Sequence, residues 1–144
     1  MNSKRLIIAE VGSVHDGSFG NACKLIEAVK NTGANAIKFQ THLAEHETLK
    51  NAPNPSYFTD ENRYDYFVRT SFSKKQWVKL KNLAKSSKLI FISSVFSIES
   101  FNLLYSCGIK NIKIPSGEVS NISLLEAISS KKDVNVILSC GMSN

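Results

Sequence analysis

The chain has 144 residues, of which 42% are hydrophobic and 21% charged, and its formal net charge is +6. These proportions are those of a globular domain, and they exclude an intrinsically disordered chain. The length suits one ordinary domain but is too short for a complete eight-stranded α/β barrel, which needs about 250 residues. An open doubly wound sheet and a truncated barrel are the α/β architectures that remain.

Strand and helix signals alternate from one end of the chain to the other. A continuous apolar run at residues 6–10 is typical of a strand buried on both faces. The further strands are predicted at residues 34–40, 89–94, 109–114 and 134–139. Four helices connect them, with apolar stripes within residues 22–29, 77–83, 101–105 and 122–128. Repeated βα units imply right-handed crossovers and a parallel sheet. The predicted fold class is therefore α/β, a partial (β/α)8 TIM barrel with about five parallel strands.

The connection over residues 41–73 is long for a compact domain and contains two prolines, Pro53 and Pro55. A short helix is expected within it at residues 60–69. Its aromatic residues predict either a lid or rim over a site or a hydrophobic plug at one end of the barrel, with equal weight. These residues are Tyr57, Phe58, Tyr64, Tyr66, Phe67 and Phe72.

Two lysines lie inside predicted strands, where side chains must face either the helices or the interior of the barrel. If Ile37 and Phe39 face the helices, Lys38 and Gln40 face the interior near the end of their strand. Lys113 lies between two isoleucines and is interpreted in the same way. Two ammonium groups from separate strands predict an anion-binding mouth.

Further polar residues follow the predicted strands. Glu10 ends the first apolar run, and it could position a hydroxyl group, move a proton, or act as counter-ion to a lysine. A structural ion pair of either lysine with Glu10 or Glu118 is the alternative to an anion site. Ser94, Ser116 and Gly117 offer hydroxyl and backbone donors to a phosphate or carboxylate.

Histidines and cysteines give no metal or disulfide prediction. His15 is expected to be structural, and His42 and His46 fall in a loop without an evident third ligand. The cysteines are three, far apart and without a CxxC pair, which favours reduced thiols and a cytoplasmic location.

Neither a nucleic acid nor a membrane is predicted as a partner. The lysines of residues 74–88 are interpreted as a solvated helix face, since no aromatic residues interleave with them as a stacking platform requires. The N-terminal apolar run is too short for a signal peptide or a membrane span.

Six segments, taken together, resemble the sialic acid synthase family, the N-acetylneuraminate synthase-like enzymes that condense phosphoenolpyruvate. The ordered set is specific, although each segment alone would be weak evidence. The segments are residues 8–17, 33–41, 91–97, 112–118, Asn121 and 137–143.

The resemblance implies a (β/α)8 barrel followed by a small antifreeze-like domain. Residues 1–144 would be the N-terminal part of that barrel, with the later strands and the C-terminal domain missing. The implied reaction joins phosphoenolpyruvate to an N-acylated amino sugar to give a sialic acid or related nonulosonate, and the fragment alone is expected to be inactive. A divalent metal, Mn or Mg, is expected in the complete enzyme with ligands outside this chain, and a homodimer is expected for a full-length chain.

The resemblance also implies roles for individual residues. Phosphoenolpyruvate would be held by Lys38, Ser94, Lys113 and Ser116, and Glu10 would be the catalytic carboxylate near the sugar and the reacting carbons. Gln40 and Glu118 would be further substrate-binding residues at the rim. Two rival interpretations stay open: a Schiff-base aldolase using Lys38 or Lys113, and a non-catalytic half-barrel that needs a partner.

Overall fold

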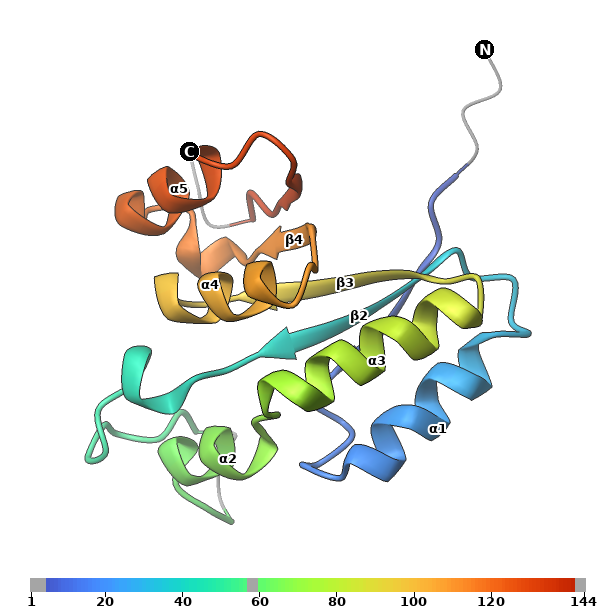
Figure 1. The fold of residues 1–144 in the computed structure, drawn as a ribbon. Helices are drawn as coiled ribbons and strands as arrows, with labels where there is room; N and C mark the ends of the chain where they lie inside the picture. Colours follow the sequence, from blue (N-terminus) through green and yellow to red (C-terminus); the bar gives the residue numbers. More distant parts are fainter. Residues whose placement is uncertain (1–4, 57–59, 142–144) are drawn as a thin grey trace.

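The computed structural model describes residues 5–56 and 60–141, which form one parallel five-stranded sheet with helices packed against it (Figure 1). The strand order is β1-β2-β3-β4-β5, so each strand pairs with its neighbours in sequence. This is the sheet predicted from the alternating pattern. The strands are β1 (Ile8–Gly12), β2 (Ala36–Thr41), β3 (Ile90–Val95), β4 (Asn111–Ile114) and β5 (Asn135–Leu138).

Five α-helices lie in the described residues: the four expected between strands and the short one expected in the long connection. Ser73 and Ser97 each form a capping box at the start of α3 and α4, which satisfies backbone N–H groups of the first turn. The helices are α1 (Phe19–Val29), α2 (Arg63–Thr70), α3 (Lys74–Ser86), α4 (Ile98–Ser106) and α5 (Ile122–Ser129), with 3-10 turns η1 (Ala44–His46) and η2 (Ser116–Glu118).

The hydrophobic core lies between the sheet and the helices. Phe39 of β2 is fully buried and meets the indole of Trp77 on α3 edge to face, with ring centroids 6.3 Å apart. Ile37, two residues earlier on the same face, is also fully buried. Because side chains alternate along a strand, Lys38 and Gln40 must lie on the other face of the sheet. The expected orientation of β2 is therefore confirmed.

The strands at the two edges of the sheet are partly exposed. Leu6 and Ile7 are 51% and 56% exposed and lie before β1, which begins at Ile8 and continues past Glu10 to Gly12. In β5, Val136 and Leu138 are 46% and 50% exposed. The expectation of a first strand buried on both faces was wrong, because an edge strand of an open sheet has a neighbour on one side only.

No helix in residues 5–56 and 60–141 combines the length and the apolar character needed to cross a bilayer.

Candidate anion-binding site at the mouth of the sheet

The strand register places polar side chains from four neighbouring strands on one face of the sheet. Glu10 pairs with Lys38 between β1 and β2, and Gln40 pairs with Ser94 between β2 and β3. Ser94 in turn pairs with Lys113 between β3 and β4. Paired residues of parallel strands point to the same side, so these five residues share the face that the helices do not cover. Three of them, Gln40, Ser94 and Lys113, lie next to the last residue of their strands.

Lys38 is the best-enclosed charge of this group. Its Nζ forms an ion pair with Oε2 of Glu10 and donates a hydrogen bond to Oγ of Ser94 at 3.3 Å. The Lys38 side chain is 11% exposed, whereas that of Glu10 is 50% exposed. The ion pair that sequence reasoning offered as an alternative therefore exists for Lys38. Because Glu10 remains half exposed, a ligand can reach the pair from solvent.

Lys113 is affected by the charges of Lys38 and Glu10. Burial, and then the positive charge of Lys38, lower the pKa of Lys113 below its ordinary value, and the carboxylate of Glu10 opposes that shift. Glu118, the other carboxylate considered as a partner, instead accepts a hydrogen bond from Nδ2 of Asn121 at 2.9 Å. Two ammonium groups thus share the region with one nearby carboxylate, so an added anion would be favourable there.

The turn after β4 brings the remaining predicted residues to this end of the sheet. Ser116, Gly117 and Glu118 form η2 directly after β4. A β-carbon placed on Gly141 would lie 4.0 Å from Cβ of Ser116, so the segment after β5 passes beside that serine. Gly117 and Glu118 also line a cavity. The structure therefore places five of the seven predicted residues on one face of the sheet and the other two, Ser116 and Glu118, in the turn after β4, without testing their roles.

A cavity of about 560 Å³ opens beside these residues. Two aromatic residues of α2, Tyr66 and Phe67, form part of its wall, so the described part of the long connection borders the mouth as a rim does. Phe72, which the sequence grouped with them, belongs instead to the core and is 4% exposed. Tyr57 and Phe58 lie outside the described residues. The lining consists of Gln40, His42, Glu47, Arg63, Tyr66, Phe67, Phe96, Gly117 and Glu118.

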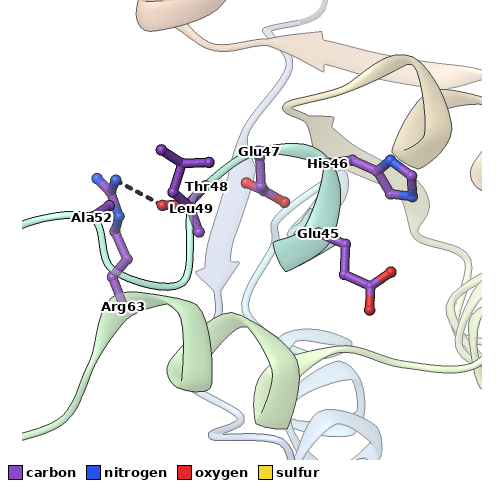
Figure 2. A pocket seen from close by; sticks show the side chains of 7 residues that line it. All are labelled: Glu45, His46, Glu47, Thr48, Leu49, Ala52 and Arg63. Carbon is purple, nitrogen blue, oxygen red and sulfur yellow. Dashed lines mark hydrogen bonds between the residues drawn. The ribbon is translucent and has the colours of Figure 1, made fainter.

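A second hollow of about 510 Å³ is lined by residues of the same connection (Figure 2). Arg63 lines it and donates a hydrogen bond from Nη2 to Oγ1 of Thr48 at 3.0 Å. Arg63 and Glu47 line both cavities. None of the seven predicted site residues lines this second hollow, so we do not connect it with the site.

His15 lies in the loop between β1 and α1 and is fully buried. Its Nδ1 accepts a hydrogen bond from the N–H of Gly17 at 3.2 Å, and its ring packs on Phe72 with centroids 4.5 Å apart. Burial lowers the pKa of His15 to about 4, against a smaller opposing effect of Asp16. A neutral, enclosed imidazole of this kind supports the structural role expected for it.

His42 is a residue whose setting sequence reasoning missed. Its ring is stacked between Phe67 and Phe96, with centroids 3.9 Å and 4.1 Å away. Its Nδ1 lies 2.7 Å from Oε2 of Glu47. These three partners come from the residue after η1, from α2 and from the residue after β3, and no periodic pattern in the sequence links these segments. In the described part of the chain, no cluster of three His, Cys, Asp or Glu residues could hold a metal ion.

The fold and the site together define a class: a parallel βα sheet of barrel type with a cationic, hydroxyl-lined mouth at the carboxyl ends of its strands. The NeuB family profile matches residues 25–144. The chain therefore belongs to the NeuB family.

Relatives of known name agree with this assignment. The N,N'-diacetyllegionaminic acid synthase of Campylobacter jejuni is 38% identical over 98% of this chain and 43% of its own length. That of Legionella pneumophila is 36% identical over 94% of this chain and 39% of its own length. The crystal structure of a sialic acid synthetase from Leptospira borgpetersenii superposes with a TM-score of 0.80 at 29% identity, over 99% of this chain and 47% of that one. The chain thus spans less than half the length of these relatives.

Proposed function

We propose that residues 1–144 form the N-terminal, phosphoenolpyruvate-binding part of a nonulosonate synthase. Such an enzyme condenses phosphoenolpyruvate with an N-acylated amino sugar. The observation that carries the proposal is the convergence of Lys38, Ser94 and Lys113 on one face at the mouth of the sheet. Phosphoenolpyruvate has a phosphate and a carboxylate, and such a dianion needs cations and hydroxyl donors at fixed points.

Each predicted residue has a place in this proposal. Lys38 and Lys113 would neutralise the phosphate and carboxylate, and the hydroxyl groups of Ser94 and Ser116 would donate hydrogen bonds to them. The ion pair between Glu10 and Lys38 supports a carboxylate held next to the bound phosphoenolpyruvate. Two further residues, Gln40 and Glu118, line the cavity. They would contact the amino sugar or phosphoenolpyruvate.

The proposed reaction forms one carbon–carbon bond and breaks one bond to phosphate. C3 of phosphoenolpyruvate attacks the aldehyde carbon of the sugar, whose oxygen takes up a proton and becomes a hydroxyl group. The cationic C2 that results adds water, which loses one proton; the carbon–oxygen bond from C2 to phosphate then breaks, and the new hydroxyl group passes its remaining proton to the leaving phosphate as the 2-keto group forms. Glu10 is the residue proposed to hold the sugar hydroxyl or carry a proton during these steps.

The divalent ion expected for the complete enzyme, Mn or Mg, does not fit the residues described here, because they contain no cluster able to hold it. Its ligands are proposed to lie in the part of the relatives that this chain does not match. For the same reason we propose that the 144 residues alone have negligible synthase activity. A homodimer of a longer chain and a cytoplasmic location stay predictions.

Calorimetric titration of the 144-residue chain with phosphoenolpyruvate tests the anion site. We expect Lys38→Met and Lys113→Met each to weaken binding by about tenfold or more, since each removes a charge-assisted contact. Lys75→Met is the matched control, because it removes one charge from an exposed position on α3. Equal effects of the three substitutions would show non-specific attraction and would contradict the site.

A second assay tests inactivity of the fragment. Purified chain, phosphoenolpyruvate, N-acetylmannosamine and Mn²⁺ are incubated together, and 2-keto acid is measured. Formation above the rate without protein would contradict the expected inactivity.

A Schiff-base aldolase is the second candidate, because the lowered pKa of Lys113 is also what an amine nucleophile needs. Borohydride treatment in the presence of pyruvate distinguishes the two. Mass addition at Lys113 or Lys38 would favour the aldolase, and an unmodified chain that binds phosphoenolpyruvate would favour the synthase.

A further inference from the structure

Glu10 and Lys38 form one ion pair but differ in how far solvent reaches them. The side chain of Lys38 is 11% exposed and that of Glu10 is 50% exposed. Nζ of Lys38 has a second partner, the hydroxyl group of Ser94 at 3.3 Å. An ammonium group has three hydrogens to donate, and two of them are directed at these partners. An anion that comes to Lys38 from solvent therefore meets an ammonium group that already holds a carboxylate.

The positive charges at the mouth are too few for Glu10 and a bound dianion together. Lys38 and Lys113 supply the two cations, and Glu10 is the carboxylate whose charge acts on Lys113. Two ammonium groups balance a dianion such as phosphoenolpyruvate. A third negative charge beside them would be repelled by the dianion. The carboxylate and the dianion therefore compete for the same two cations.

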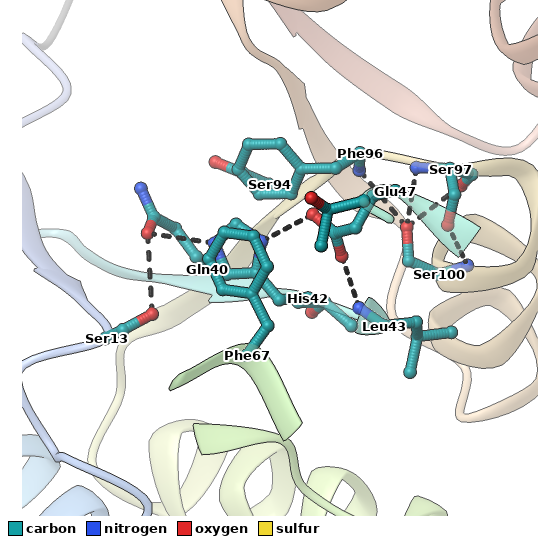
Figure 3. A network of polar contacts seen from close by, with 12 residues as sticks. Ser13, Gln40, His42, Leu43, Glu47, Phe67, Ser94, Phe96, Ser97 and Ser100 are labelled. Carbon is teal, nitrogen blue, oxygen red and sulfur yellow. Dashed lines mark hydrogen bonds and ion pairs between the residues drawn. The ribbon is translucent and has the colours of Figure 1, made fainter. Parts of the chain in front are cut away.

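A bulge in β1 leaves the carboxylate of Glu10 room to move. The register with β2 shifts between Glu10 and Gly12, so β1 has one residue more than its partner strand there. A β-carbon placed on Gly12 would lie 3.5 Å from Oε1 of Glu10 and 3.7 Å from Oε1 of Gln40. Gln40 borders the same space, and the hydroxyl group of Ser13 donates to its Oε1 at 3.4 Å (Figure 3). Because Gly12 has no β-carbon, the space beside the Glu10 carboxylate stays open.

We infer that Glu10 is an internal competitor at the anion site: its carboxylate pairs with Lys38 in the free chain, and a bound anion displaces it from that ammonium group. In the free chain, the pair offsets the cost of enclosing a charged lysine. The bound anion takes over this role, and Glu10 turns toward solvent and Gly12 while it remains beside the site. Glu10 thereby lowers the affinity for every anion that uses Lys38. The inference rests on the proposed function only for naming phosphoenolpyruvate as that anion.

Titration calorimetry of the 144-residue chain with inorganic phosphate and with phosphoenolpyruvate tests the competition. We expect both anions to bind about fivefold to tenfold more tightly to Glu10→Gln than to the wild type, because the competing carboxylate is gone. Asp133→Asn is the matched control. Asp133 also pairs with a lysine, Lys110 at 3.1 Å, but these two residues precede β5 and β4 at the opposite end of the sheet. Unchanged or weaker binding to Glu10→Gln, or an equal gain in Asp133→Asn, would overturn the inference.

Glu10→Asp separates displacement from simple repulsion. Aspartate keeps the negative charge but is one methylene group shorter, so its carboxylate should no longer reach Nζ of Lys38. If an anion has to break this ion pair, both anions should bind Glu10→Asp nearly as tightly as Glu10→Gln. Binding at the wild-type affinity would show that only the nearby charge matters, and it would overturn the displacement.

A measurement on the unaltered chain does not depend on how the variants fold. Nuclear Overhauser contacts between the side chains of Glu10 and Lys38 should be present in the free chain. They should be lost when inorganic phosphate saturates the site. Contacts that persist at saturation would overturn the inference.

The outcomes separate this inference from the proposed function. Tighter phosphate binding to both Glu10 variants, with phosphoenolpyruvate bound no better than phosphate, would support the competition and contradict the proposed function. Phosphoenolpyruvate that binds better than phosphate, with the same affinity for the wild type and Glu10→Gln, would overturn the competition and support the proposed function.

Discussion

Gly17 and Arg69 are packed so closely that a β-carbon on Gly17 would lie 2.2 Å from the carbonyl oxygen of Arg69. The contact joins the loop after β1 to the last turn of α2. The Arg69 side chain strengthens it, because its guanidinium forms ion pairs with both Asp16 and Glu61. The long connection that borders the cavity is thus fastened to the loop that carries His15.

Gly17→Ala should destabilise the chain strongly. Gly17 has a φ of +78°, and its missing side chain leaves room for a backbone carbonyl that cannot move aside easily. Gly33→Ala is the matched control, with a φ of +85° but nothing within 4 Å of the added carbon. Gly33→Ala should lower the free energy of unfolding by about 1–2 kcal/mol, because alanine is strained in the left-handed conformation. Gly17→Ala should lower it by about 2 kcal/mol more. Urea unfolding of both variants measures this, and equal losses would contradict the close packing.

Stability should decline on mild acidification because of His15. Its pKa is about 4 in the folded chain against 6.5 ordinarily, so the unfolded chain binds more protons between these values. The stabilisation is complete above pH 6.5 and is lost as the pH falls toward 4, by at most about 3 kcal/mol. In His15→Asn, whose amide oxygen can still accept from Gly17 N–H, the decline over this range should be smaller. Parallel declines in urea unfolding at pH 7 and pH 4.5 would show that other groups are responsible.

Glu10→Gln should lower the pKa of Lys113 further. The carboxylate of Glu10 opposes the effects of burial and of Lys38, and the substitution removes that opposition. In the variant, Lys113 of the folded chain should lose its proton at a still lower pH, whereas in the unfolded chain it keeps the ordinary pKa of 10.5. The free energy of unfolding should therefore rise with pH over a wider range below 10.5. NMR titration of the lysine side chains gives the pKa directly. An unchanged or raised pKa of Lys113 would show that Glu10 does not act on it.

The 144-residue chain should self-associate at high concentration through β5. Val136 and Leu138 are 46% and 50% exposed on an edge strand, next to an apolar groove between β5 and α5. Leu138→Lys should shift the sedimentation equilibrium toward monomer. Leu49→Lys, at a residue 74% exposed but in the long connection, should not. A wild-type chain that stays monomeric, or equal effects of the two substitutions, would contradict association at this edge.

The parts of this molecule that were predictable from sequence depend on regular repetition. The alternation of strands and helices, the inward orientation of Lys38 and the capping residues Ser73 and Ser97 all follow from period and neighbours. The exposure of Leu6 and Ile7 was not predictable, because an apolar run is the same whether its strand lies at the centre or the edge of a sheet.

The surroundings of His42 were unpredictable for a different reason. Phe67 and Phe96 lie far from it in sequence; Phe67 meets it from α2, and Phe96 meets it because Thr41 pairs with Val95 where β2 and β3 end. Such a meeting has no local signature. The grouping of Phe72 with the aromatic residues of a lid, rim or plug was wrong for the same reason, since aromatic content alone does not distinguish a cavity wall from a core.

The strand order also bears on how the molecule is made. Within residues 5–56 and 60–141, each strand hydrogen-bonds only to the strands before and after it in the sequence, so none of these pairings has to wait for a distant segment to be synthesised. A nascent chain leaving the ribosome can extend its sheet one unit at a time, at low entropic cost of loop closure. Until the next unit arrives, each newly added strand is itself the unprotected end of the growing sheet.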